Sequence, residues 1–343
     1  MGLTPERFAG TPAEWDRFAE TQSGFTHFHR FGWNRVIERV FGHECLYLAA
    51  RDDRKHLASV LPLVRVRSRL FGHYLVSMPF VNYGGPLGSR EGIGLLAGEA
   101  VRLARESGTR LLELRSRTQQ PLDLPVSHRK ITVVLDLPPD PDTLFNAFPA
   151  KLRSQIRRPG KEGIEFRFGP PPDQVAPFFQ VFSHHMRDLG TPTLPRRFFA
   201  AVAESFPDAW LGCAWQGDRP IACGLAFRWG NELEMTWASS LAAYSRVAPN
   251  MLLYWSFLER AVAERVTLFN FGRCTPDSGT HRFKRQWGSR DEPLFWYQWT
   301  PAGEPAATPS PDQGHYAWGP RLWKHLPVGL SRVLGPWIVR SIP

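Results

Sequence analysis

The chain reads Phe269-Asn270-Phe271-Gly272-Arg273, and eight residues further on it reads His281-Arg282-Phe283-Lys284-Arg285-Gln286-Trp287-Gly288. The first stretch predicts an apolar strand that delivers polar groups to the edge of a sheet. The second predicts a short helix that carries Lys284 between Phe283 and Trp287. A lysine held in a partly dry site can stabilise negative charge that appears only in a transition state, as an oxyanion-hole group does in acyl transfer.

Length and composition place the chain among globular proteins with two domains. It has 343 residues, of which 43% are hydrophobic, and domains usually have roughly 100 to 200 residues. No stretch approaches the roughly 18 apolar residues that predict a membrane span. The first residues, Met1 to Glu6, have neither a basic start nor an apolar segment, so we expect no secretory signal and a cytoplasmic location.

The net charge and the cysteine spacing indicate which partners and metals the chain is expected to bind. The formal net charge of +10 favours an anionic partner, and phosphates, acidic glycans, RNA and membrane surfaces all qualify. Ordinary compositional bias toward arginine is an equally simple explanation. The spacing of the four cysteines predicts free thiols and no metal site; they are Cys45, Cys213, Cys223 and Cys274.

Hydrophobic periodicity predicts the same order of elements twice, as internal duplication would produce. The first half has predicted helices at 12–20 and 29–40, strands at 45–51, 56–67 and 73–78, a helix at 90–107 and a strand at 110–115. The second half has a strand at 131–137, helices at 141–158 and 173–189, strands at 209–216, 219–229 and 232–238, a helix at 249–264 and a strand at 266–271. A hairpin, a third strand, a crossover helix and a parallel strand therefore occur in each half, which predicts an α/β fold with mixed sheets.

Turn-forming residues suggest the domain boundaries. The polar run 116–130 separates the halves, which gives domains at 1–125 and 126–300, followed by a Pro-rich linker and tail at 301–343. Residues 316–343 form a basic amphipathic segment. It either lies on an anionic membrane surface or packs its aromatic face onto the second domain.

The two opening stretches, with Pro293-Leu294 beyond them, resemble the C-terminal signature of the FemAB-like group of acyltransferases. Further similarities lie at 79–85, 151–158 and 186–192, in the order that the family has them. The resemblance is greatest to members associated with exosortase and exopolysaccharide systems. It implies two tandem GNAT-like domains, a catalytic role for Lys284, and positions for donor or acceptor at Asn270, Gly272 and Arg273.

Other residues of the chain are candidates for substrate binding. Arg153 and Arg157 lie one turn apart on a predicted helix whose buried face carries Leu152 and Ile156, and paired guanidinium groups suit a phosphate or a carboxylate. A solvated basic face is the simpler alternative. Two further candidates are Tyr83 and Trp237, whose rings suit sugars. Arg187 and Thr191 lie at a loop beside the acceptor cleft that the resemblance implies. The last two are Asn250 at a helix start and Trp287 beside the lysine. Arg187 could instead pair with Asp188.

The pattern that binds coenzyme A in standard GNAT enzymes is incomplete in both halves. In the second half the position reads Arg246-Val247-Ala248-Pro249-Asn250-Met251, where proline removes an N–H and Met251 stands in place of glycine. We therefore expect no tightly bound cofactor. The acyl donor is a co-substrate: acyl-CoA, another acyl thioester, or aminoacyl-tRNA. The long helical arm linked to tRNA binding in several FemAB-type enzymes is missing, so a tRNA partner stays open, and no DNA partner is expected.

Together these features predict an N-acyltransferase or aminoacyltransferase. By resemblance, the acceptor is an amine of a small-molecule or lipid-linked sugar precursor in cell-envelope or exopolysaccharide assembly. The alternative is a non-catalytic protein that binds an anionic glycan or lipid in a basic cleft at the inner membrane. Nonspecific RNA binding is a third possibility, which predicts an affinity that falls steeply with salt.

Overall fold

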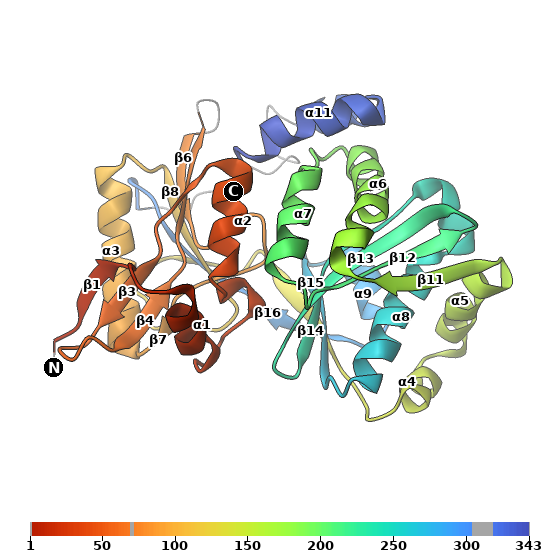
Figure 1. Ribbon diagram of the computed structural model, residues 1–343, viewed down its shortest axis with the longest axis horizontal. Coiled ribbons are helices and arrows are strands. Elements are labelled where there is room, and N and C mark those ends of the chain that lie inside the picture. The colour runs from red at the N-terminus through yellow and green to blue at the C-terminus, as the bar shows by residue number, and fades with distance from the viewer. Residues whose placement is uncertain (1, 69–71, 304–317, 343) are drawn as a thin grey trace. The chain divides into compact units, whose positions relative to one another are not determined.

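Each half of the chain forms sheets of its own. The computed structural model (Figure 1) describes residues 2–68, 72–303 and 318–342. The described residues of the first compact unit are 2–68, 72–130, 293–303 and 340–342. Those of the second unit are 131–292 and 318–339.

The second unit is built on a seven-stranded sheet with the order β11-β12-β13-β14-β15-β10-β16. Its strands are β10 (Ile131–Asp136), β11 (Ile164–Gly169), β12 (Trp210–Gln216), β13 (Arg219–Trp229), β14 (Glu232–Ser240), β15 (Leu268–Cys274) and β16 (Arg290–Pro293). Strands β14 and β15 are parallel, with Glu234 opposite Asn270, because helix α8 (Pro249–Ala263) crosses over between them. This pair of strands carries the candidate site.

Helices cover both faces of this sheet (Figure 1). The helices of this unit are α4 (Pro141–Ala147), α5 (Ala150–Lys161), α6 (Pro171–Leu189), α7 (Arg196–Ser205), the 3₁₀ helix η2 (Ala242–Val247), α8, α9 (Gly279–Arg285), α10 (Trp318–Trp323) and α11 (Val328–Val339). Neighbouring residues of β13 show which helix lies on which face. The Cys223 thiol is 3.5 Å from a carbonyl of α6, whereas a Cβ on Gly224 would lie 3.0 Å from Leu253 and Phe257 of α8. Because successive residues of a strand point to opposite faces, α6 and α8 lie on opposite sides.

The first unit contains two sheets, with the orders β1-β3-β4-β7 and β2-β5-β6-β8-β17-β9. Its strands are β1 (Thr4–Arg7), β2 (Glu44–Cys45), β3 (Leu48–Arg51), β4 (Leu57–Leu61), β5 (Val64–Ser68), β6 (Gly72–Val76), β7 (Leu87–Gly88), β8 (Leu111–Ser116), β9 (Val126–Ser127) and β17 (Phe295–Trp299). Its helices are α1 (Pro12–Glu20), η1 (His27–His29), α2 (Gly32–Phe41) and α3 (Arg90–Glu106). The single strand predicted at 56–67 is two strands in different sheets, because Pro62 between them has no N–H for a ladder.

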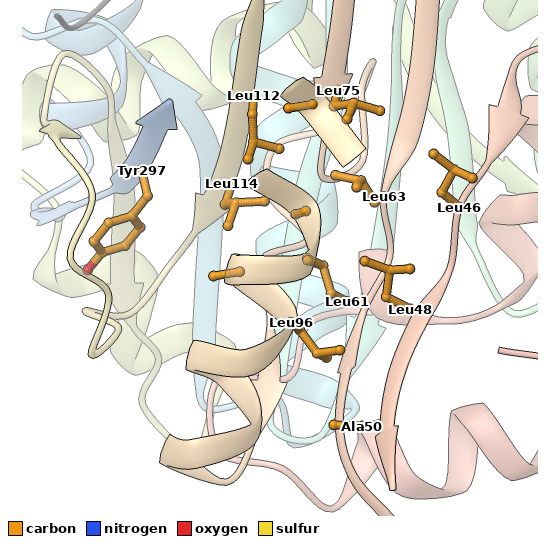
Figure 2. Close-up of a cluster of buried hydrophobic side chains, with 13 residues drawn as sticks. Leu46, Leu48, Ala50, Leu61, Leu63, Leu75, Leu96, Leu112, Leu114 and Tyr297 are labelled. Atoms are coloured by element: carbon orange, nitrogen blue, oxygen red, sulfur yellow. The ribbon is translucent and has the colours of Figure 1, made fainter. Parts of the chain in front are cut away.

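A cluster of buried leucines and alanines holds helix α3 against the strands of the first unit. Figure 2 shows Leu96 of α3 among side chains from β3, β4, β6 and β8. Ala97, Ala100 and Ala104 continue this face of the helix at a spacing of three or four residues, and their small side chains let the helix lie close to the sheet. Tyr297 of β17 belongs to the same cluster.

The placement of β17 differs from the domain division expected from the sequence. Residues 293–300 were expected in the second domain, but β17 pairs antiparallel with β8 of the first unit. Buried polar groups fix this pairing: the Gln298 amide donates to Glu113 at 2.8 Å, and Glu113 also accepts from Arg115 at 2.7 Å. Nothing adjacent in sequence to β17 reveals these partners, so the local pattern could not assign the strand.

The predicted repetition of topology is confirmed. In the first unit β6 is parallel to β8, with Val76 opposite Glu113, and α3 lies between them in sequence. In the second unit β14, α8 and β15 repeat this arrangement. The Pro-rich linker expected at the start of 301–343 falls mostly outside the described residues. In the described part of the chain, no helix is both long and apolar enough to cross a bilayer.

Candidate functional site

The site begins with a bulge near the end of β15. Thr132 of β10 lies opposite Arg273, but Val134 lies opposite Asn270, so β15 has one residue more than its partner over this interval. Gly272 lies within the bulge with a φ of 75°, a left-handed conformation that glycine adopts without strain. The backbone therefore requires glycine at this position, and the contact with donor or acceptor that the resemblance implies for Gly272 stays a prediction.

Lys284 reaches this bulge from helix α9. The helix starts at Ser278, whose hydroxyl accepts a hydrogen bond from the His281 N–H. The Lys284 ammonium donates to the carbonyl oxygen of Gly272 at 2.7 Å and to that of Arg273 at 3.1 Å. An ammonium group has three N–H donors, and the described residues accept two of them. The third donor has no acceptor among the described residues.

Burial sets the charge state of Lys284. The residue is 3% exposed, and desolvation lowers the pKa of its ammonium from 10.5 to about 8. Negative charge at Cys274 and Glu234 opposes this shift, and the neighbouring Arg273 adds to it. Lys284 is therefore still charged at neutral pH, although its proton is held much less tightly than that of an exposed lysine.

The aromatic residues do not hold the lysine in the way that the sequence suggested. Trp287 is fully buried and packs against Phe148 and Phe271 with ring centroids 5.5 and 6.3 Å apart. Phe283 lies 6.4 Å from Trp287. These rings form a core that fixes α9 against β15, while backbone carbonyls anchor the ammonium group.

A buried polar network supports the same strand and contains two carboxylates, those of Glu232 and Glu234. The Asn270 amide donates to Glu232 at 2.8 Å and to Glu234 at 3.2 Å, and its oxygen accepts from the Gly272 N–H at 2.8 Å and the Thr132 hydroxyl at 2.6 Å. Glu234 is 0% exposed. The signal in the sequence is a pair of glutamates two residues apart in an apolar strand, which places both on one face.

We predict that Gly272→Ala removes most of any activity that depends on Lys284. A side chain at positive φ costs about 1–2 kcal/mol, and relaxation of the bulge moves the two carbonyls that hold the ammonium. Gly288→Ala is the matched control, because Gly288 has a φ of 79° and open space around its Cβ position. Both variants should lose similar stability in urea denaturation. Equal activity in the two variants would contradict the role assigned to the bulge.

The structure assigns local partners to the two arginines of α5. Leu152 and Ile156 are buried, as predicted. Arg153 donates to the carbonyl of Asn146 at 2.9 Å, and the Arg157 guanidinium lies 4.7 Å from the centre of the Phe145 ring. These contacts join α5 to α4, and binding of an anion by the pair stays a prediction.

Arg187 has local partners in the structure, and its binding of a substrate stays a prediction. It forms an ion pair with Asp188 at 2.8 Å and donates to the carbonyl of Leu326 at 3.1 Å. The alternative of mutual pairing is therefore the one observed. Thr191 follows the left-handed Gly190 that ends α6, and its N–H bonds back to the Met186 carbonyl at 2.9 Å.

The other candidates have different surroundings. Tyr83 is fully buried and packs edge-on against Phe28 at 5.5 Å, so its ring cannot serve as an open platform for a sugar, and that expectation is wrong. Trp237 is partly exposed and contacts Phe198 and Phe199. Asn250 lies in the first turn of α8, the helix whose Tyr254 packs against Phe283 of α9. The structure thus brings Asn270, Gly272, Arg273 and Lys284 together, with Trp287 behind them.

Within the described residues, no group of three or more His, Cys, Asp or Glu side chains is arranged to hold a metal ion. The arrangement that is present combines a buried cation with a spare donor and a rigid polar strand. Such a fixed donor can stabilise an oxygen atom that becomes negative during a reaction, because it needs no reorganisation when the charge develops.

Comparisons with known proteins agree with this geometry. A family model described as an acetyltransferase (GNAT) domain matches residues 147–285, which include the bulge and Lys284. The UDP-N-acetylmuramoylpentapeptide-lysine N(6)-alanyltransferase of Weissella viridescens is 26% identical over 154 residues, which are 43% of this chain and 45% of that protein. The match therefore spans about half the length of that relative.

Solved structures match over most of the chain. The crystal structure of FemX superposes with a TM-score of 0.64 at 13% identity and covers 87% of this chain and 97% of its own. A tandem GNAT protein from the clavulanic acid biosynthesis pathway has a TM-score of 0.51 at 15% identity, covering 89% and 99%. At these identities the matches show the fold, which is that of two tandem GNAT-like domains. Residues 147–285 thus match a GNAT acetyltransferase domain, in a chain whose fold is similar to that of FemX and whose sequence is similar to that of an alanyltransferase.

Proposed function

We propose that this protein is an N-acyltransferase or aminoacyltransferase whose acceptor is an amine of a cell-envelope or exopolysaccharide precursor. The observation that carries the proposal is the buried Lys284 ammonium, anchored by the two carbonyls of the β15 bulge and with one N–H to spare. The name of the Weissella relative describes transfer of an alanyl group to the N6 amine of a lysine in a UDP-linked muramoyl pentapeptide. The proposed reaction and the reaction in that name share the transfer of an acyl or aminoacyl group to an amine.

In the proposed reaction, the neutral acceptor amine adds to the acyl carbon of the donor. The carbonyl oxygen becomes negative, and the third N–H of Lys284 donates to it. The bond between the acyl carbon and the sulfur or oxygen of the donor then breaks. The amide remains as product, and the proton lost by the amine ends on the released thiol or hydroxyl group. Arg273, beside the lysine, would position the donor or the acceptor.

The donor is a co-substrate, either an acyl thioester such as acyl-CoA or an aminoacyl-tRNA, and no tightly bound cofactor is part of the proposal. Both kinds of donor are made in the cytoplasm, where we place the reaction. The acceptor is a small-molecule or lipid-linked sugar. Arg153 and Arg157 would hold its phosphate or carboxylate groups, provided that they give up their present contacts with α4.

The proposal is tested by incubating the purified chain with acyl-CoAs, acyl-carrier thioesters and aminoacyl-tRNAs in turn, with envelope extract as acceptor. Mass spectrometry should detect a new amide with one class of donor. The same extract with its amines chemically acetylated is the control and should give none. Retention of an anionic glycan or lipid, without transfer from any donor, would instead support a binding protein.

A further inference from the structure

Helix α11 exposes the face that a helix of a water-soluble protein normally buries. Its large apolar side chains Leu330, Val333, Leu334 and Trp337 are 44%, 62%, 40% and 69% exposed. At 3.6 residues per turn these four positions fall within about 100° of the helix circumference. They form one continuous apolar strip, which we call the α11 strip.

The opposite face of α11 explains why the strip points outward. Ser331 and Gly335 are buried, and a Cβ on Gly335 would lie 2.8 Å from the backbone nitrogen of Thr193. Arg332 donates to the Ser183 hydroxyl of α6 at 2.8 Å. The helix is thus anchored through its small and polar residues, and this close contact leaves no room to turn the large apolar side chains inward.

The charged side chains of α10, of α11 and of the residues between them are all basic. No Asp or Glu follows Asp312 in the sequence. Arg321 and Lys324, on α10 and directly after it, are exposed, as is Leu322 between them at 60%. An apolar strip beside these exposed cations complements a surface that is apolar inside and anionic at its boundary. This is the structure of a bilayer with acidic headgroups.

The length of the helix fixes how it can meet such a bilayer. The 12 residues of α11 extend about 18 Å, whereas the hydrocarbon core is about 30 Å thick. A tryptophan at the end of the strip suits the boundary between headgroups and acyl chains, where amphipathic rings collect. We propose that the α11 strip and the basic residues of 318–324 form a docking surface for an anionic lipid bilayer, with α11 lying in the plane of the interface.

The experiment is sedimentation of the full chain with lipid vesicles, without donor or acceptor, so that its outcome does not depend on the proposed chemistry. The wild type should sediment with vesicles that contain phosphatidylglycerol and much less with vesicles of phosphatidylcholine alone. Val333→Ser should weaken the partitioning about ten-fold, the loss expected for one buried apolar side chain. Arg321→Ala and Lys324→Ala should each weaken it about five-fold, and added salt should reduce the difference between lipids.

Val126→Ser is the matched control, because Val126 is an equally simple apolar side chain, 40% exposed, on β9 of the first unit. It should partition as the wild type does, and the melting temperatures of all variants should agree. Equal partitioning of Val333→Ser and Val126→Ser would overturn the proposal. So would light scattering that shows a dimer lost in Val333→Ser without any vesicle binding, which would assign the strip to a second copy of the chain.

Discussion

Lys284→Met should lower the rate of acyl transfer about 10²–10³-fold, the loss typical of removing one oxyanion donor. Methionine keeps the buried apolar stem but cannot donate to a developing negative oxygen. The Gly272 and Arg273 carbonyls lose a partner, which costs stability, but the chain no longer has to bury a charge. We therefore expect the variant to remain folded in urea denaturation while single-turnover kinetics show the lost rate.

Arg282→Met is the control on the same helix. Arg282 is exposed and donates to the Asp277 carbonyl, so it carries a similar charge without contact with the bulge. Its transfer rate should stay within about two-fold of the wild type, since surface changes have small effects. If Lys284→Met retained the wild-type rate with every donor, the proposed role of the ammonium group would be excluded.

The pH dependence follows from the lowered pKa of Lys284. The charged form is the active one, so the transfer rate should fall as the pH rises through about 8. Stability should change in the opposite direction. The unfolded lysine keeps its proton up to its ordinary pKa of 10.5, so between about 8 and 10.5 the unfolded chain binds more protons and stability rises with pH. The difference between wild type and Lys284→Met isolates this contribution.

Asn270→Asp should destabilise the second unit by about 3–5 kcal/mol, as expected when a buried charge loses its compensating partner. The change is nearly isosteric, but it replaces the NH₂ group that donates to Glu232 and Glu234 with an oxygen atom and so creates a third buried carboxyl group. The bulge should also loosen, with loss of transfer. Urea denaturation at neutral and at acidic pH measures the cost, which should shrink in acid because a proton can then bridge two carboxyl groups.

Thr132→Val provides the comparison for Asn270→Asp. It removes a neutral donor, the hydroxyl that bonds to the Asn270 oxygen at 2.6 Å, and should cost about 1 kcal/mol. Both variants change the same polar network. Only Asn270→Asp leaves carboxyl groups facing one another, because Thr132→Val keeps the amide that donates to Glu232 and Glu234. Similar losses in both would mean that Glu232 and Glu234 do not depend on the amide for their burial.

The sequence by itself determined the features that neighbouring residues encode. The strands of the hairpin β12–β13, the helical face of Leu152 and Ile156, and the repeated order of elements each depend on residues a few positions apart, where side-chain direction follows from local backbone geometry. Gly272 belongs with them, because only glycine occupies its backbone conformation without strain. The resemblance to FemAB-like enzymes rests on such short stretches as well, and it singled out Lys284, whose catalytic role stays a prediction.

Some groups have partners that are remote in sequence, and only the tertiary structure decided where these groups lie. Glu234 is buried because an amide 36 residues away donates to it, and β17 joins the first unit because Gln298 meets Glu113 across 185 residues. The outward face of α11 depends in the same way on Ser183 of α6. Burial of a polar or apolar side chain is a balance between desolvation and its contacts, and a linear sequence does not specify contacts of this range.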